Sequence, residues 1–146
     1  MTDEESKDEL LFKQYELMVN STLQVTAWRQ TSNGFYITLN TAILAILSGI
    51  FETQDVAYLL LGVAGIAIST FWYMHIDYFA KLNGAKFDVI WKMEERFPIK
   101  AYVEEYEYFK AKKCKSATQI EKGLVCVFVI IYIIILVTSI LNILTS

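Results

Sequence analysis

The sequence predicts an all-α, polytopic membrane protein with three transmembrane helices and a helical cytosolic bundle. Three observations predict this class. Hydrophobic residues make up 55% of the 146 residues, charged residues are segregated from long apolar runs, and two of those runs are separated only by residues 52–55. Three uncharged runs of this length would leave too little chain to cover them from water.

The apolar runs cover residues 35–51, 56–74 and 123–144. As a helix the first run reaches roughly 25 Å, near the lower limit for a hydrocarbon core of about 30 Å. The short connection makes the first two runs an antiparallel hairpin. We therefore expect an N-terminal amphipathic cytosolic helix, a transmembrane hairpin, a cytosolic helical region and a third transmembrane helix, at residues 1–34, 35–74, 75–122 and 123–146.

The distribution of Lys and Arg predicts the orientation. Segment 1–34 holds Lys7, Lys13 and Arg29, the loop 52–55 holds none, and the other ten of the 13 basic residues lie in 75–122. Because basic loops stay on the cytosolic side, the N-terminus is predicted in the cytosol and the C-terminus outside. No cleavable signal peptide is expected, since residues 1–9 are acidic. Aromatic residues at the cytosolic ends of the spans are expected to be lipid-interface anchors: Trp28, Phe71, Trp72 and Tyr73.

The cytosolic segments carry apolar faces at helical spacing. In the N-terminal segment the face is made by residues at steps of four and three: Leu11, Tyr15, Met18, Thr22 and Val25. After the second run, a helix is predicted to continue until Pro98 stops it. One side of this helix is lined by Phe79, Leu82, Val89, Met93 and Phe97, and is broadened by Phe87 and Ile90. Asn83-Gly84 in mid-helix predicts either a close helix contact or a kink.

Small residues within the spans predict close helix packing. The first span has Thr38, Ala42, Ala45 and Gly49 at steps of four and three, and the second has Gly62, Gly65 and Ser69. One stripe is expected to serve the hairpin, leaving the other for a neighbouring subunit. Asn40 has two interpretations: an interhelical hydrogen bond, or a pore-lining ring in an oligomer, together with Thr38 and Thr41.

The chain shows no pattern for catalysis, and no catalytic, cofactor-binding or metal-binding residues are predicted. His75 is the only histidine, and Cys114 and Cys126 are the only cysteines, which are too few ligands for a tetrahedral metal site. A disulfide between the two cysteines is not expected, because they fall in different environments. The adjacent Glu94 and Glu95 are expected on solvated helix surface. A net charge of −3 does not favour a nucleic-acid partner.

Residues 78–90, with the sequence YFAKLNGAKFDVI, carry a family resemblance together with Met93-Glu94 and Phe97-Pro98. It is extended by Tyr102 with Glu105, and by Thr118 with Ile120-Glu121, which lead into a last apolar run that contains Phe128 and Tyr132. The chain resembles the RipA family of small octameric bacterial membrane proteins and, more distantly, SLATT-type membrane effectors of anti-phage systems. The resemblance implies a bacterial cytoplasmic (inner) membrane location and a homo-octamer.

The leading hypothesis is a non-enzymatic, homo-oligomeric membrane scaffold or interaction assembly in contact with lipid and an unidentified cytosolic protein. The alternative is a pore-forming membrane effector, in stress or anti-phage defence. The residues predicted to pack helices or subunits are Gly62, Gly65, Ser69, Phe79, Leu82, Asn83, Lys86, Phe87, Val89, Ile90 and Met93.

Overall fold

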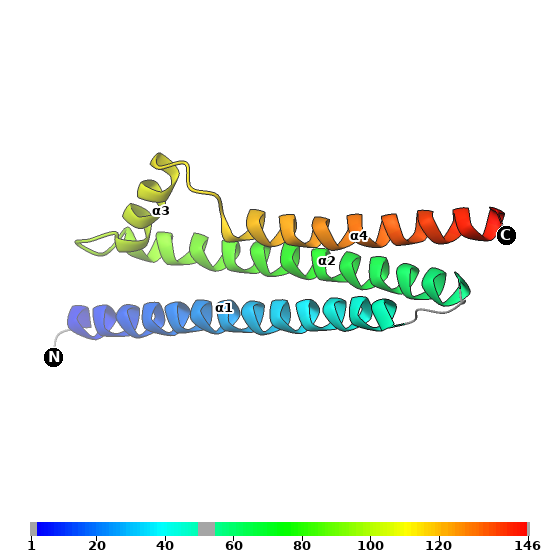
Figure 1. Ribbon diagram of the computed structural model, residues 1–146. Helices are drawn as coiled ribbons and strands as arrows, with labels where there is room; N and C mark the ends of the chain where they lie inside the picture. The colour runs from blue at the N-terminus through cyan, green and yellow to red at the C-terminus, as the bar shows by residue number, and fades with distance from the viewer. Residues whose placement is uncertain (1–2, 50–54, 146) are drawn as a thin grey trace. The chain divides into compact units, whose positions relative to one another are not determined.

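The computed structural model describes residues 3–49 and 55–145, and nearly all of them are helical (Figure 1). The four helices are α1 (Asp3–Gly49), α2 (Asp55–Glu94), α3 (Ala101–Ala111) and α4 (Ala117–Thr145). The predicted all-α class is confirmed. α2 ends at Glu94, because Pro98 has no N–H to donate to the Glu94 carbonyl and its ring would clash with that carbonyl if the helix continued.

The described residues form two compact units, and α1 and α2 each contribute to both. Unit 1 contains residues 3–29 and 78–116, which are the start of α1, the end of α2, and α3. Unit 2 contains residues 30–77 and 117–145. Unit 1 therefore joins the N-terminal segment to the connector, the two segments from which the sequence predicts the cytosolic bundle.

Unit 1 is built on the apolar face predicted for the N-terminal helix. Its five residues are all buried or partly buried: Leu11, Tyr15, Met18, Thr22 and Val25. Ile90 of α2 is fully buried. The ring of Tyr15 on α1 meets the ring of Phe97, which follows α2, edge-on at 5.0 Å between centroids. The structure thus confirms this face as the packing face of α1.

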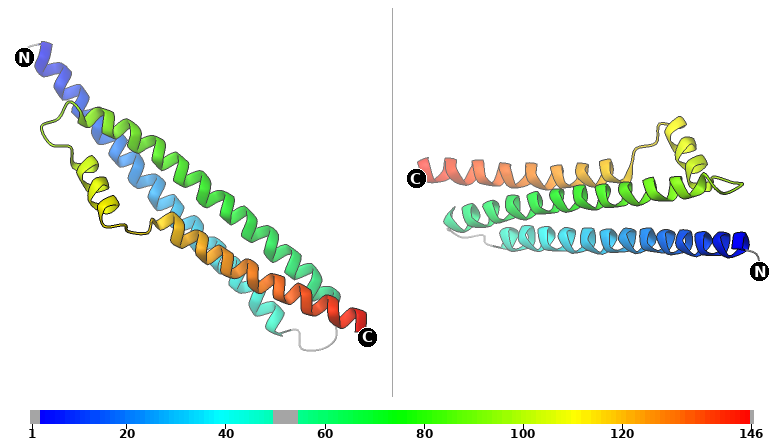
Figure 2. Two further views of the ribbon diagram at one scale, coloured as in Figure 1. Left: turned by 90° about the horizontal axis from the view of Figure 1, so that it is seen from above. Right: turned by 180° about the vertical axis from the view of Figure 1, so that it is seen from behind.

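Unit 2 is a three-helix bundle in which α1 and α4 both run antiparallel to α2 (Figures 1 and 2). Two clusters of buried side chains hold these helices together. One contains Ile43, Leu47 and Tyr132, and the other contains Trp72, Ile76 and Val125. The remaining surface of α4 is apolar: Ile130, Ile134, Val137 and Leu141 are all about half exposed.

Two helices within the described residues are long and apolar enough to cross a membrane: Val56–Glu94 and Ala117–Thr145. The first predicted span, 35–51, is not among them. Thr38, Asn40 and Thr41 lower its hydropathy, and residues 50–51 lie outside the described part of the chain.

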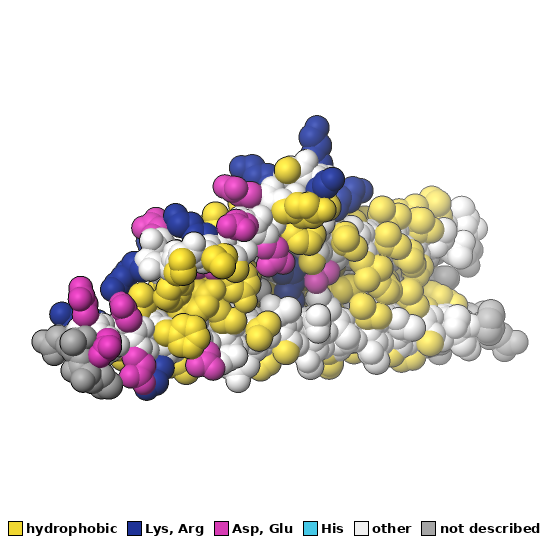
Figure 3. Space-filling model, turned by 90° about the vertical axis from the view of Figure 1, so that its left-hand side faces the viewer, with side chains coloured by type: hydrophobic (Ala, Val, Ile, Leu, Met, Phe, Trp, Pro, Cys, Tyr) yellow, Lys and Arg dark blue, Asp and Glu magenta, His cyan; other side chains and the backbone are white. Residues whose placement is uncertain are grey.

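On the face in Figure 3, charged side chains gather over one part of the molecule, and another part is hydrophobic and uncharged.

Two local predictions need correction. Trp72 was expected to be an interface anchor, but it is 1% exposed and packs inside the chain. Its indole stacks on Tyr36 at 6.0 Å between centroids, and its Nε1 donates to Asn33 Oδ1 at 2.8 Å. At Asn83-Gly84 the helix continues without a break, and no atom lies within 4 Å of a Cβ built on Gly84. The close contact is made by Asn83 instead, whose Nδ2 donates to Thr26 Oγ1 at 3.2 Å.

Candidate functional site

The end of α2 carries a fully buried carboxylate, which corrects the expectation that Glu94 is solvated. Glu94 is 0% exposed and accepts three hydrogen bonds. Tyr15 Oη donates to its Oε1 at 2.9 Å, the Tyr102 amide donates to Oε1 at 3.0 Å, and the Val103 amide donates to Oε2 at 3.2 Å. The carboxylate therefore joins α1, α2 and the N-terminus of α3.

This arrangement is favourable because the first amides of a helix lack partners and carry a partial positive charge. Lys100, at the N-cap of α3, makes no side-chain capping bond, so Glu94 supplies the acceptor from another helix. Burial and the neighbouring Glu94 carboxylate raise the pKa of Tyr15 to about 12. In the sequence, Glu94 continues the line of Ile90 at a step of four, and that spacing could have predicted its burial.

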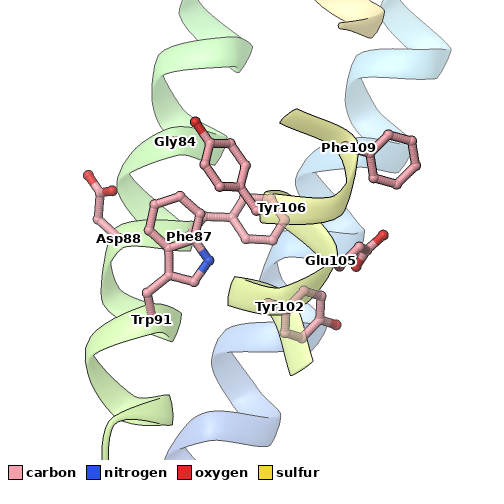
Figure 4. Close-up of a pocket in the computed structure, with 8 residues that line it drawn as sticks. All are labelled: Gly84, Phe87, Asp88, Trp91, Tyr102, Glu105, Tyr106 and Phe109. Carbon is pink, nitrogen blue, oxygen red and sulfur yellow. The ribbon is translucent and has the colours of Figure 1, made fainter. Parts of the chain in front are cut away.

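Apart from the hydrogen bonds of Glu94, unit 1 contains a cleft of about 550 Å³ that is lined by aromatic rings of α2 and α3. Its lining residues are Gly84, Phe87, Asp88, Trp91, Tyr102, Glu105, Tyr106 and Phe109. The rings contact one another: Trp91 and Tyr106 lie 4.9 Å apart between centroids, and Phe87 and Tyr102 lie 5.7 Å apart. Figure 4 shows the rings of Phe87, Trp91 and Tyr106 gathered between the two helices, with Asp88 and Glu105 on either side.

The cleft has the size of a small-molecule site, for which volumes of roughly 300–1,000 Å³ are usual. Gly84 lines the cleft without a side chain, and no atom lies within 4 Å of the position that a Cβ would take there. The Trp91 Nε1 atom is buried, and no acceptor for it lies among the described residues. The cleft was not predicted, because α2 and α3 residues become neighbours only after the chain turns back at Pro98.

Polar contacts between α1 and α2 involve two of the predicted packing residues. Lys86 Nζ donates to Ser21 Oγ at 2.5 Å, and Asn83 bonds Thr26 as described above. Phe79 and Ile90 are also inside the chain, at 8% and 0% exposure. Leu82, Phe87 and Met93 are partly buried, and Val89 is 39% exposed. Most of the predicted subunit-packing face is therefore occupied within one chain.

In unit 2, a polar node joins all three helices. Asn40 and Ser69 are both 0% exposed, and Ser69 Oγ donates to Asn40 Oδ1 at 3.0 Å. Asn40 Nδ2 donates to Tyr36 O at 2.8 Å, and Tyr132 Oη donates to Asn40 O at 3.1 Å. Of the two interpretations of Asn40, the structure has the interhelical hydrogen bond.

The glycines of the second span make room for α4. A Cβ on Gly62 would lie 2.8 Å from Leu136 Cδ2, and a Cβ on Gly65 would collide with the Tyr132 ring. The stripe of Gly62, Gly65 and Ser69 is therefore used inside the chain. The stripe on α1 is exposed on the single chain: Thr38, Ala42, Ala45 and Gly49. Thr41, the third predicted pore-lining residue, is exposed as well.

The chemical groups considered from the sequence lie apart. Cys114 and Cys126 are free thiols on the surface, and the His75 ring meets Tyr36 edge-on at 5.8 Å. Within residues 3–49 and 55–145, no three His, Cys, Asp or Glu side chains are grouped so that they could hold a metal ion.

Comparisons with known proteins give one family. Neither the curated proteins nor the solved structures include a match to this chain. The model of the Octameric membrane protein family (8xMP) matches residues 12–141, which confirms the resemblance to an octameric membrane family found in the sequence. Because this match covers most of the chain, the protein belongs to the octameric membrane protein family.

Proposed function

We propose that the protein is a non-enzymatic scaffold, a homo-octamer of the bacterial cytoplasmic membrane. The observation that carries the proposal is the apolar surface that α1 exposes within unit 1. Its large side chains are more than half exposed in the single chain: Leu10 at 57%, Phe12 at 58%, Leu17 at 68% and Leu23 at 61%. Large apolar side chains that stay exposed along one helix of a charged segment favour a surface that another protein covers.

The spacing of these residues supports contact on two sides. At 3.6 residues per turn, Leu10 and Leu17 share one side of α1, and Phe12 and Leu23 share another. The buried stripe around Thr22 runs between the two sides. In a closed ring each subunit contacts two neighbours through two different surfaces. Two apolar sides on one helix fit that requirement, and members of this family are octameric.

Aspartate at Leu17 or Leu23 tests the proposed interface. A carboxylate in an apolar contact between subunits should dissociate the octamer, because a buried charge without a partner is strongly unfavourable. Native mass spectrometry in detergent should then report smaller species. Tyr108→Asp is the matched control, since Tyr108 is 61% exposed, as Leu23 is, but lies on α3 rather than on α1. An octamer that survives Leu17→Asp and Leu23→Asp would reject this interface.

The topology is part of the proposal. We infer three transmembrane helices, with 35–51 as the first, the N-terminus in the cytosol and the C-terminus outside. The concentration of Lys and Arg in 75–122 supports it. In a Cys126→Ser background, an impermeant maleimide should reach Cys114 only after the membrane is opened. A Ser146→Cys variant of the same background should react in intact spheroplasts. The reverse pattern would invert the topology.

A pore remains the rival function, and it is supported by the exposure of Thr38 and Thr41. It is weakened by Asn40, whose polar atoms are used inside the chain. Ion flux through proteoliposomes separates the two functions. Flux that falls in Thr38→Val and Thr41→Val variants would favour the pore, whereas impermeable vesicles that contain intact octamer would favour the scaffold.

A further inference from the structure

The aromatic cleft of unit 1 has a composition that selects for positive charge. The faces of Trp, Tyr and Phe rings carry negative electrostatic potential and attract cations within about 6 Å. Five of the eight lining residues are aromatic, namely Phe87, Trp91, Tyr102, Tyr106 and Phe109. The two charged lining residues, Asp88 and Glu105, are both acidic. Anions are therefore disfavoured, and a neutral apolar ligand would gain nothing from the two carboxylates.

The ring arrangement leaves surfaces for a ligand after the contacts between the rings are made. Trp91 and Tyr106 pack at 50° between ring planes, and Phe87 and Trp91 at 39°, so the rings form an angled wall rather than a closed stack. Tyr106 and Phe109 are each 51% exposed. Asp88 comes from α2 and Glu105 from α3, and in Figure 4 both side chains extend outward from the ring cluster, so their negative charge lies at the edges of the cleft that they line.

We propose that this cleft binds a small organic cation of the quaternary-ammonium or alkylammonium class. The methyl or methylene groups of such a cation contact the rings, and the carboxylates of Asp88 and Glu105 neutralise its charge. This inference does not depend on the proposed scaffold role, since it rests on unit 1 of a single chain. The competing explanation is that the rings only attach α3 to α2, and in that case charge on a ligand is irrelevant.

Choline and its neutral isostere dimethylbutanol, in which carbon replaces nitrogen, distinguish these explanations. The detergent-solubilised protein is titrated with each by calorimetry, in a maltoside detergent that has no choline headgroup. Saturable binding of choline with at least tenfold weaker binding of the isostere supports the proposal. Equal binding of both compounds, or no binding of choline, overturns it. Phosphocholine as a third ligand identifies the source: weaker binding than choline indicates a free cation, and tighter binding indicates a lipid headgroup.

Two tyrosines of α3 provide a matched pair of variants. Tyr106 lines the cleft and Tyr108 does not, although both are exposed, at 51% and 61%. Tyr106→Leu should weaken choline binding about three- to thirtyfold, the range that loss of one cation–π contact gives. Tyr108→Leu should bind as the wild type does. The double variant Asp88→Asn/Glu105→Gln should weaken binding severalfold and reduce its dependence on salt.

Each variant is compared by octamer mass and circular dichroism, so that loss of binding is separated from loss of fold. If Tyr106→Leu keeps its fold and its affinity for choline, the cleft is not the binding site. The same conclusion follows if Tyr108→Leu and Tyr106→Leu weaken binding equally.

Discussion

Gly65→Ala is the substitution that tests most directly how α2 and α4 pack in unit 2. A Cβ at this position collides with Cδ1, Cε1 and Cζ of Tyr132. The Tyr132 ring is 0% exposed and its hydroxyl is held by Asn40 O, so it has no free space into which to move. Alanine gains roughly 1 kcal/mol of helix propensity over glycine. Overpacking a core costs roughly 1–3 kcal/mol, and the severity of this contact places the cost near 3. We expect a net loss of about 2 kcal/mol.

Two other glycines serve as graded controls. At Gly62 the nearest atom to an added Cβ is the end of the Leu136 side chain, which can rotate away, so alanine should cost less than at Gly65. At Gly34 nothing lies within 4 Å, and alanine should be neutral or stabilising by up to roughly 1 kcal/mol.

Thermal unfolding of the three variants in one detergent, followed by near-ultraviolet circular dichroism, should rank them as Gly34→Ala, Gly62→Ala and Gly65→Ala from most to least stable. Tyr132→Leu provides the coupling test, because removing the ring should abolish most of the penalty at Gly65. A Gly65→Ala protein with wild-type unfolding and a dissociated octamer would refute the reasoning, since it would place this glycine between subunits.

Three further predictions concern hydrogen-bonded groups. Glu94→Gln leaves one carbonyl oxygen in place of the two carboxylate acceptors. The free energy of unfolding should therefore fall by about 1–3 kcal/mol, and hydrogen exchange at the Tyr102 and Val103 amides should become faster. Asn40→Leu removes the bond from Ser69 and should cost about 0.6–2 kcal/mol in unfolding assays; an unchanged stability would contradict the node. The folded-state pKa of Tyr15 is raised from 10 to about 12, so the neutral hydroxyl stabilises the folded state. This contribution to the free energy of unfolding is complete below pH 10 and is lost as pH rises through 12. Tyr15→Phe should therefore be less sensitive than the wild type to alkaline unfolding in this window.

The sequence by itself determined the helical class, the family and the apolar face of the N-terminal helix. These features depend on local patterns: long uncharged runs, hydrophobic residues at steps of three and four, and a contiguous family block around Leu82 and Phe87. The i,i+4 geometry of helices makes such patterns readable without any knowledge of tertiary contacts, and so the stripe through Tyr15 and Thr22 was predicted correctly.

Only the tertiary structure decided which partners the remaining side chains meet. Glu94 appears solvated in the sequence, and its burial arises because the chain turns at Pro98 and places the α3 amides against it. Trp72 has the composition of an interface anchor, but Asn33 and Tyr36 of α1 enclose it. A helical stripe specifies that a face is buried but not against what, since lipid, a neighbouring helix and a second subunit favour the same small and apolar residues.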